Sequence, residues 1–137
     1  MSSSSIPISR FFAENLGAPF RNTRWSWGAT DKVRKRLFLR LWSDDRDTAL
    51  ARVRVLEKYL THDNRPGLHE RRQHLELIRT GQYTAFGVLC DRDRPGGPIR
   101  DFNSRIVLRL GALVDDEDFV YATVLGHILV TGLEEAR

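Results

Sequence analysis

The stretch RNTRWSWGAT, residues 21–30, places two tryptophans two positions apart, with short polar side chains beside them. Trp25 and Trp27 flank Ser26, and Asn22 lies three residues before Trp25. Indole rings stack on nucleobases, and amide and hydroxyl groups hydrogen bond to base edges. The stretch therefore predicts a pocket for a base turned out of its strand. The plain alternative is that both indoles belong to the hydrophobic core.

A third aromatic wall and a set of basic side chains complete this expected pocket. Trp42 ends the apolar run RLFLRLW and is the third indole. Arginine and lysine bind backbone phosphates, and arginine does so in a bidentate manner. The residues expected to hold phosphates are Arg24, Arg34, Lys35, Arg36 and Arg40. Tyr83 and Phe86 also lie at predicted strands.

The positive charge of the chain is concentrated in its first part. The net charge is +4, but residues 1–60 carry 12 basic and 6 acidic residues, whereas residues 61–137 carry 10 and 12. Of the 22 basic residues, 19 are arginine, which also stacks on flat rings. This distribution favours a nucleic-acid partner. A codon bias toward arginine, with guanidinium groups on solvated strand faces, would explain it without one.

The histidines do not have the spacing of a metal site. His69 and His74 are five residues apart, which separates them by about 140° around a helix at roughly 100° per residue. His62 and His127 have no histidine or cysteine beside them in the sequence. The single cysteine, Cys90, ends an apolar run and is expected to be a buried structural thiol. We therefore predict no metal, no cofactor and no catalytic residue.

Two acidic clusters leave a different class of function open. Asp44, Asp45 and Asp47 form the first, and the run DDED at residues 115–118 forms the second. Metal-dependent nucleases use grouped carboxylates to hold Mg²⁺ and to position a water molecule. Aspartate is also a common turn former, and both clusters lie where turns are expected. A small metal-dependent nuclease therefore stands as an alternative to a binding module.

Hydrophobic periodicity predicts two helices and six or seven strands. In the clearest strand, residues 36–42, the leucines share one face and Phe38, Arg40 and Trp42 the other. Strand alternation over residues 23–30 would place Trp25 and Trp27 on one face. The helices are expected over 8–17, capped by Ser9, and over 68–81. The remaining strands are expected over 49–59, over 83–91 and on both sides of the turn in 105–129, with a short strand at the end.

These elements predict an α+β fold: a mixed, largely antiparallel sheet curled toward a barrel, with one or two packed helices. We expect a flexible N-terminus over residues 1–8 and a single globular domain over residues 9–137. No secretion signal is present, and no apolar run approaches the roughly 18 residues of a membrane span. A lone cysteine suits a reducing compartment, so the expected location is the cytoplasm, without membrane contact.

Three strings, NTRWSWGA, RLFLRLW and HERRQHLELIRTGQYTAFGV, resemble in this order the PUA-like domains, which include the SRA, ASCH, EVE and YTH groups. They are also similar to the N-terminal reader regions of HNH-type restriction endonucleases that act on modified DNA. The likeness spans residues 10–125 and implies a curled sheet whose pocket accepts a flipped base, methylated or plain. No HNH-like segment follows, so such a reader would act alone or with a separate nuclease partner.

The sequence thus favours a nucleic-acid-binding module, linked to restriction or defence, that recognises a modified or plain base in DNA, with RNA as the other substrate. Trp25, Trp27 and Trp42 would form the pocket walls, and Asn22 and Ser26 would hydrogen bond to the base edge. A homodimer is compatible with this function. The alternative from a third class is a protein-interaction or assembly subunit whose aromatic residues lie in an interface.

Overall fold

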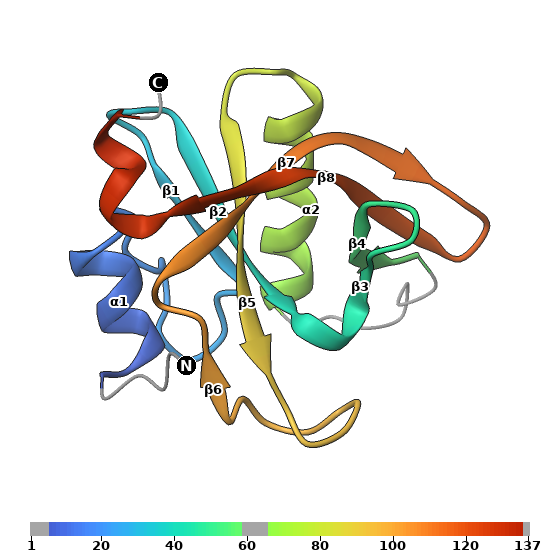
Figure 1. The fold of residues 1–137 in the computed structure, drawn as a ribbon, viewed down its shortest axis with the longest axis horizontal. Helices are drawn as coiled ribbons and strands as arrows, with labels where there is room; N and C mark the ends of the chain where they lie inside the picture. Colours follow the sequence, from blue (N-terminus) through green and yellow to red (C-terminus); the bar gives the residue numbers. More distant parts are fainter. Residues whose placement is uncertain (1–5, 59–65, 136–137) are drawn as a thin grey trace.

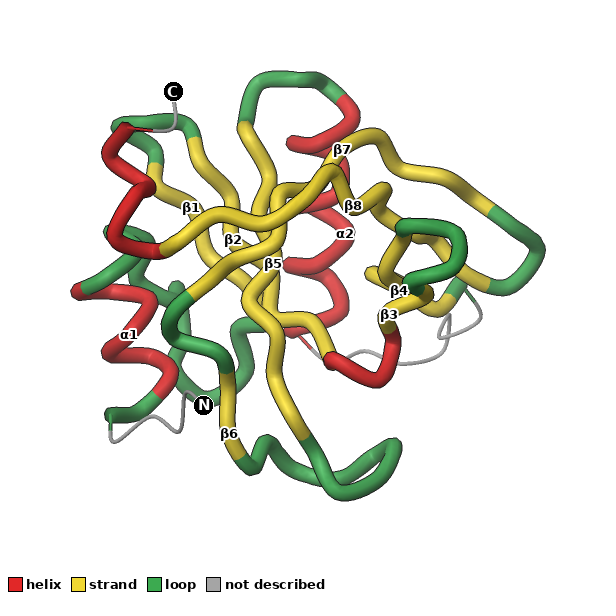
Figure 2. The backbone as a smooth tube through the Cα atoms, in the orientation of Figure 1, coloured by secondary structure: helices red, strands yellow, loops and turns green. Residues whose placement is uncertain are grey.

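A computed structural model describes residues 6–58 and 66–135 of the chain, which form two α-helices and one eight-stranded sheet (Figures 1 and 2). The helices are α1 (Ile8–Glu14) and α2 (Pro66–Arg79). The strands are β1 (Gly28–Asp31), β2 (Arg36–Trp42), β3 (Arg46–Asp47), β4 (Arg52–Glu57), β5 (Thr84–Asp91), β6 (Asp101–Phe102), β7 (Ile106–Asp115) and β8 (Phe119–Leu129). Two 3₁₀ turns, η1 (Ser43–Asp45) and η2 (Val130–Glu135), complete the fold.

The predicted mixed α+β class is confirmed, and most strand pairs are antiparallel. The sheet order is β1-β2-β5-β7-β8-β4-β3, with β6 added beside β5. Among the strands of the described residues, only β2 and β5 pair in parallel, and the chain between them supplies β3, β4 and α2. The longest pairing joins β7 to β8 around the acidic turn, as the sequence predicts.

A short connection forces this sheet to curl. β2 and β3 lie five steps apart along the strand order, which in a flat sheet at about 4.8 Å per strand is about 24 Å. Only η1 joins them in the chain, and its four peptide units reach at most about 14 Å. The two ends of the sheet therefore bend toward each other. The curl stops short of a closed barrel, because no pairing joins β2 to β4.

Strand alternation in β2 divides the core between the two faces of the sheet. Phe38 packs with Phe11 and Phe12 of α1, whereas Leu37 and Leu39 pack with residues such as Leu75 of α2. The faces match the predicted ones, because side chains of a strand alternate with a period of two. Within the described residues, no helix is long and apolar enough to cross a membrane.

Several local predictions are wrong or fall outside the described residues. Trp25 lies in a turn and Trp27 in a bend, since β1 begins only at Gly28. Pro7, and not Ser9, precedes the first helix. The short strand expected at the end of 105–129 is not separate, because β8 runs to Leu129. Of residues 1–8, the stretch expected to be flexible, Ile8 already belongs to α1, and residues 1–5 lie outside the described part of the chain. Residues 59–65, which include His62, also lie outside it.

Candidate functional site

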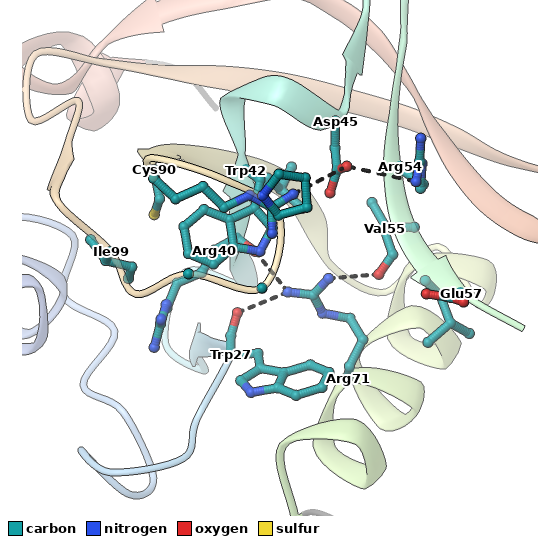
Figure 3. Close-up of a pocket in the computed structure, with 16 residues that line it drawn as sticks. Trp27, Arg40, Trp42, Asp45, Arg54, Val55, Glu57, Arg71, Cys90 and Ile99 are labelled. Atoms are coloured by element: carbon teal, nitrogen blue, oxygen red, sulfur yellow. Dashed lines mark hydrogen bonds and ion pairs between the residues drawn. The ribbon is translucent and has the colours of Figure 1, made fainter. Parts of the chain in front are cut away.

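The open seam between β2 and β4 contains a cavity of about 540 Å³ (Figure 3). Ligand pockets commonly measure about 300–1,000 Å³. Trp42 and Arg40 of β2 line one side, and Arg54 of β4 lines another. Trp27 and the loop that follows β5 contribute the remaining walls. The structure thus brings three of the predicted site residues, Trp27, Arg40 and Trp42, to one cavity.

Arg71 of α2 bridges the seam where strand pairing is missing (Figure 3). Its Nη1 donates to the Val55 carbonyl at 2.6 Å, and its Nη2 donates to the Arg40 carbonyl at 2.8 Å. The same Nη2 donates to the Trp27 carbonyl at 3.0 Å. One guanidinium therefore ties β2, β4 and the tryptophan loop together and forms part of the cavity floor.

The charges of Arg71 and Arg40 are not balanced by ion pairs among the described residues. Arg71 is 5% exposed, and its Nε is buried without a hydrogen-bond partner. Burial and the nearby charge of Arg40 lower the pKa of Arg71 to about 10, so it stays protonated at neutral pH. Burial also lowers the pKa of Arg40, whose Nη1 donates to the Ser26 carbonyl at 3.0 Å. The cavity therefore has a positive wall that suits an anion.

The loop that carries the tryptophans is held by α2 and by its own polar groups. The Ser26 hydroxyl, 1% exposed, donates to Glu70 at 3.1 Å, and Glu70 also accepts the Trp27 N–H. Burial raises the pKa of Glu70, although these hydrogen bonds oppose the shift. The Asn22 carboxamide oxygen accepts the Arg24 N–H at 2.8 Å. Ser26 and Asn22 are the residues expected to read a base edge, but Ser26 hydrogen bonds to Glu70 of α2 and Asn22 to the loop backbone.

The Trp27 ring packs directly against Gly67 at the start of α2. A Cβ on Gly67 would lie 2.4 Å from Trp27 Nε1, closer than such atoms approach, so only glycine allows this contact. The Arg71 guanidinium carbon lies 5.9 Å from the centre of the Trp27 ring. The indole is half-buried and lines the cavity, so a planar group entering the cavity can contact it.

Trp42 reaches the cavity together with an arginine that covers its ring. The Arg92 guanidinium carbon lies 4.3 Å from the ring centre, within stacking range. Two hydrogen bonds, at 2.7 and 2.9 Å, hold Arg92 to the carboxylate of Asp44. A ligand on this side would therefore meet Arg92 as well as the indole.

The remaining predicted site residues lie away from the cavity. Trp25 lines a smaller hollow of about 280 Å³ beside His69 and Glu70. Arg24 is exposed in the loop. The residues Arg34, Lys35 and Arg36 surround the β1–β2 turn, about 20 Å along β2 from Trp42. There Arg34 and Arg36 form ion pairs with buried Asp31, and Lys35 lies over the Tyr83 ring.

Both acidic clusters form turns and local pairs. Asp44 binds Arg92, and Asp47 accepts the Leu50 N–H and the Arg52 Nε–H. Asp116 accepts the N–H groups of Asp118 and Phe119. Among the described residues, no group of three or more His, Cys, Asp or Glu side chains is arranged to hold a metal ion. The predicted buried thiol is confirmed: burial raises the pKa of Cys90 to about 11.

Sequence reasoning missed Arg71, Arg54 and Arg92 as cavity residues. Arg71 and Glu70 lie on one face of α2 with Gly67 and His74, at helical spacings of three and four residues, and all four are buried. The helical spacing that indicates which apolar residues of α2 share a face also indicates that these polar residues share one. No comparable signal exists for Arg54 and Arg92, which reach the cavity from a strand and a loop.

The chain matches no family model, no curated protein and no solved structure. The class of protein is therefore argued from the geometry of the cavity.

Proposed function

We propose that the chain is a nucleic-acid-binding module whose seam cavity holds one nucleotide. The base would contact Trp27 on one side and the Arg92-covered Trp42 on the other. The phosphate would lie toward Arg40 and Arg71. The observation that carries this proposal is a pair of protonated arginines, buried Arg71 and half-buried Arg40, that form no ion pair among the described residues and line the same cavity as two indoles. A ligand that is both flat and anionic fits such a site.

This proposal revises the residue roles while keeping the class of function. Trp27, Trp42 and Arg40 keep their predicted roles. Trp25, Asn22 and Ser26 instead shape the loop, and Arg71 takes the place of the arginines at the β1–β2 turn. The cavity suits any flat, anionic nucleotide, so the proposal covers both DNA and RNA and both modified and plain bases. The PUA-like relationship and the link to restriction or defence stay predictions.

Tryptophan fluorescence during oligonucleotide titration tests the proposal. Single- and double-stranded DNA and RNA, plain and methylated, are compared, because a base stacked on an indole usually quenches its emission. We expect quenching that persists in Trp25→Phe and disappears in Trp27→Phe. Since Trp25 lies outside the cavity, the two variants are matched. Quenching that is lost in Trp25→Phe, or no response to any oligonucleotide, would overturn the proposal.

The phosphate contact has its own test. Arg40→Gln should weaken oligonucleotide binding about tenfold, whereas Arg24→Gln, an exposed arginine outside the cavity, should change it little. Equal effects of the two changes would indicate nonspecific attraction to the protein surface and remove the assigned role of Arg40.

A second candidate function is assembly with another copy of the chain. Leu125 and Leu129 of β8 are 61% and 55% exposed, and β4 pairs with β8 only as far as Thr123. Light scattering on the purified chain distinguishes the two functions. A dimer that Leu125→Glu dissociates, without affinity for any oligonucleotide, would favour assembly.

A further inference from the structure

Two arginines of β4 each lie over an aromatic ring of the neighbouring strand β8. The Arg54 guanidinium carbon lies 4.1 Å from the Phe119 ring centre, and that of Arg52 lies 3.8 Å from the Tyr121 ring centre. These distances are those of stacked cation–aromatic pairs. The side chains occupy the face of β4 opposite to Val53 and Val55, which are buried in the core.

This pair of stacked arginines begins at the rim of the nucleotide cavity. Arg54 is itself a lining residue of the cavity. Arg52 lies two residues back along β4, on the same face, and so about 6.6 Å further from the cavity. If one nucleotide of a polymer occupies the cavity, the next nucleotides along the strand would therefore lie over Arg54 and then Arg52.

The charge of both guanidinium groups is already balanced. Arg52 Nε donates to Asp47 at 3.3 Å, and Arg54 Nη1 lies 3.8 Å from Asp45. The two side chains nevertheless remain 25% and 40% exposed. Asp47 hydrogen bonds to one edge of Arg52, and Asp45 forms a longer ion pair with Arg54, whose Nε is buried without a hydrogen-bond partner. An aromatic ring covers one face of each guanidinium group, so the opposite face is the part available to a ligand. Such a face stacks on bases, whereas neutralised edges have little remaining attraction for phosphates.

We propose that Arg54 and Arg52 form a stacking platform for single-stranded nucleotides adjoining the one in the cavity. The platform rests on the proposed function and extends it by specifying the substrate as a single strand of at least three nucleotides. A duplex would keep its neighbouring bases paired and could not lay them on the sheet. Binding to the platform depends on base stacking, and its contribution changes little with salt.

A length series tests the platform. Dissociation constants are measured for deoxyadenylate as the mononucleotide, dinucleotide and trinucleotide, at low and high salt. Stacking raises affinity by roughly tenfold for each added base, and this gain should persist at high salt. In Arg52→Gln the gain from dinucleotide to trinucleotide should disappear. Arg46→Gln is the matched control, because Arg46 is exposed on the adjacent strand β3 and its loss should leave the gain intact.

Arg52→Lys separates stacking from charge, since lysine keeps the charge and loses the planar group. If lysine preserves the gain, or if Arg46→Gln removes it, the platform is overturned. If the mononucleotide binds in a Trp27-dependent manner and affinity does not rise with length, the platform fails while the cavity stands. If neither mononucleotide nor oligomers bind, the proposed function fails as well. Circular dichroism confirms that each variant is folded.

Discussion

The guanidinium of Arg71 joins segments that no strand pairing connects. Its hydrogen bonds to Arg40 of β2 and Val55 of β4 span the open seam, and its bond to Trp27 fixes the aromatic loop. A buried charge without an ion pair is unfavourable in itself. Three carbonyl oxygens offset that cost and keep the cation in place, so one residue both stabilises the fold and provides charge for a ligand.

Replacing Arg71 by methionine should destabilise the protein by about 2–4 kcal/mol. The change keeps the bulk of the side chain but leaves three carbonyl groups without their charged donor, and a buried polar group that loses its hydrogen-bond partner costs about 1–3 kcal/mol. Urea unfolding measures the change. Arg72→Met, at the half-buried next position, is the control and should cost under about 1 kcal/mol. Equal stability of Arg71→Met and the unmodified protein would contradict the bridging role.

His74 makes stability depend on pH. Burial, assisted by the charge of Arg71, lowers its pKa from 6.5 to about 4. Between these values the unfolded chain binds a proton that the folded chain does not, so stability falls as pH decreases through this window. The expected loss from pH 7 to pH 5 is about 2 kcal/mol for this residue.

Urea unfolding at several pH values, compared between the unmodified protein and His74→Gln, isolates this contribution. Burial raises the pKa of both Asp45 and Glu70, which gives the opposite pH dependence, and both groups remain in the variant. The unmodified protein should therefore lose more stability on acidification than His74→Gln. Parallel pH profiles would show that His74 titrates normally in the folded state.

At the scale of elements, the sequence predicts where α2 lies in the chain, but not that α2 positions the tryptophan loop. Its apolar residues and the terminal Gly81 indicate a helix, and the alternation of β2 indicates both of its faces. The segment 23–27 reads as a strand because it alternates, yet Glu70 binds Ser26 from 44 residues away. This long-range hydrogen bond holds the segment in a turn although its alternation favours a strand. No pattern in the local sequence indicates such a contact.

Gly67→Ala tests how α2 positions the aromatic loop. Alanine favours helix by about 1 kcal/mol over glycine, but its Cβ would lie 2.4 Å from Trp27 Nε1. We expect a net destabilisation of about 1–3 kcal/mol and a red-shifted tryptophan emission as the indole moves. Gly132→Ala is the control, because the nearest atom to its Cβ would be 3.9 Å away. A blue shift or a gain in stability for Gly67→Ala would contradict the close packing.

At the scale of the whole molecule, the sequence indicates the class of fold but not the order of its strands. A single short connection, η1, determines the curl, and that consequence requires knowing that β2 and β3 lie at distant places in the sheet. The pairing of β2 with β5 crosses more than forty residues, from Arg36↔Thr84 to Trp42↔Cys90. The cavity depends on the same long-range arrangement. Its lining is therefore predicted only for residues on β2 and in the tryptophan loop, although the helical spacing of α2 could also have indicated Arg71.

The two core clusters should unfold together, because the same strands supply both. β2 contributes Phe38 to the cluster beneath α1 and Leu39 to the cluster beneath α2, and β5 and β7 alternate in the same way. Neither cluster can lose its packing without disturbing strands of the other. Truncation on either face, Phe12→Ala or Leu75→Ala, should then lower the stability of the whole domain by about 2–5 kcal/mol. Urea transitions followed by far-ultraviolet circular dichroism and by tryptophan fluorescence should coincide in both variants. Separate transitions, with one probe unaffected by one of the truncations, would show that the faces of the curled sheet are independent folding units.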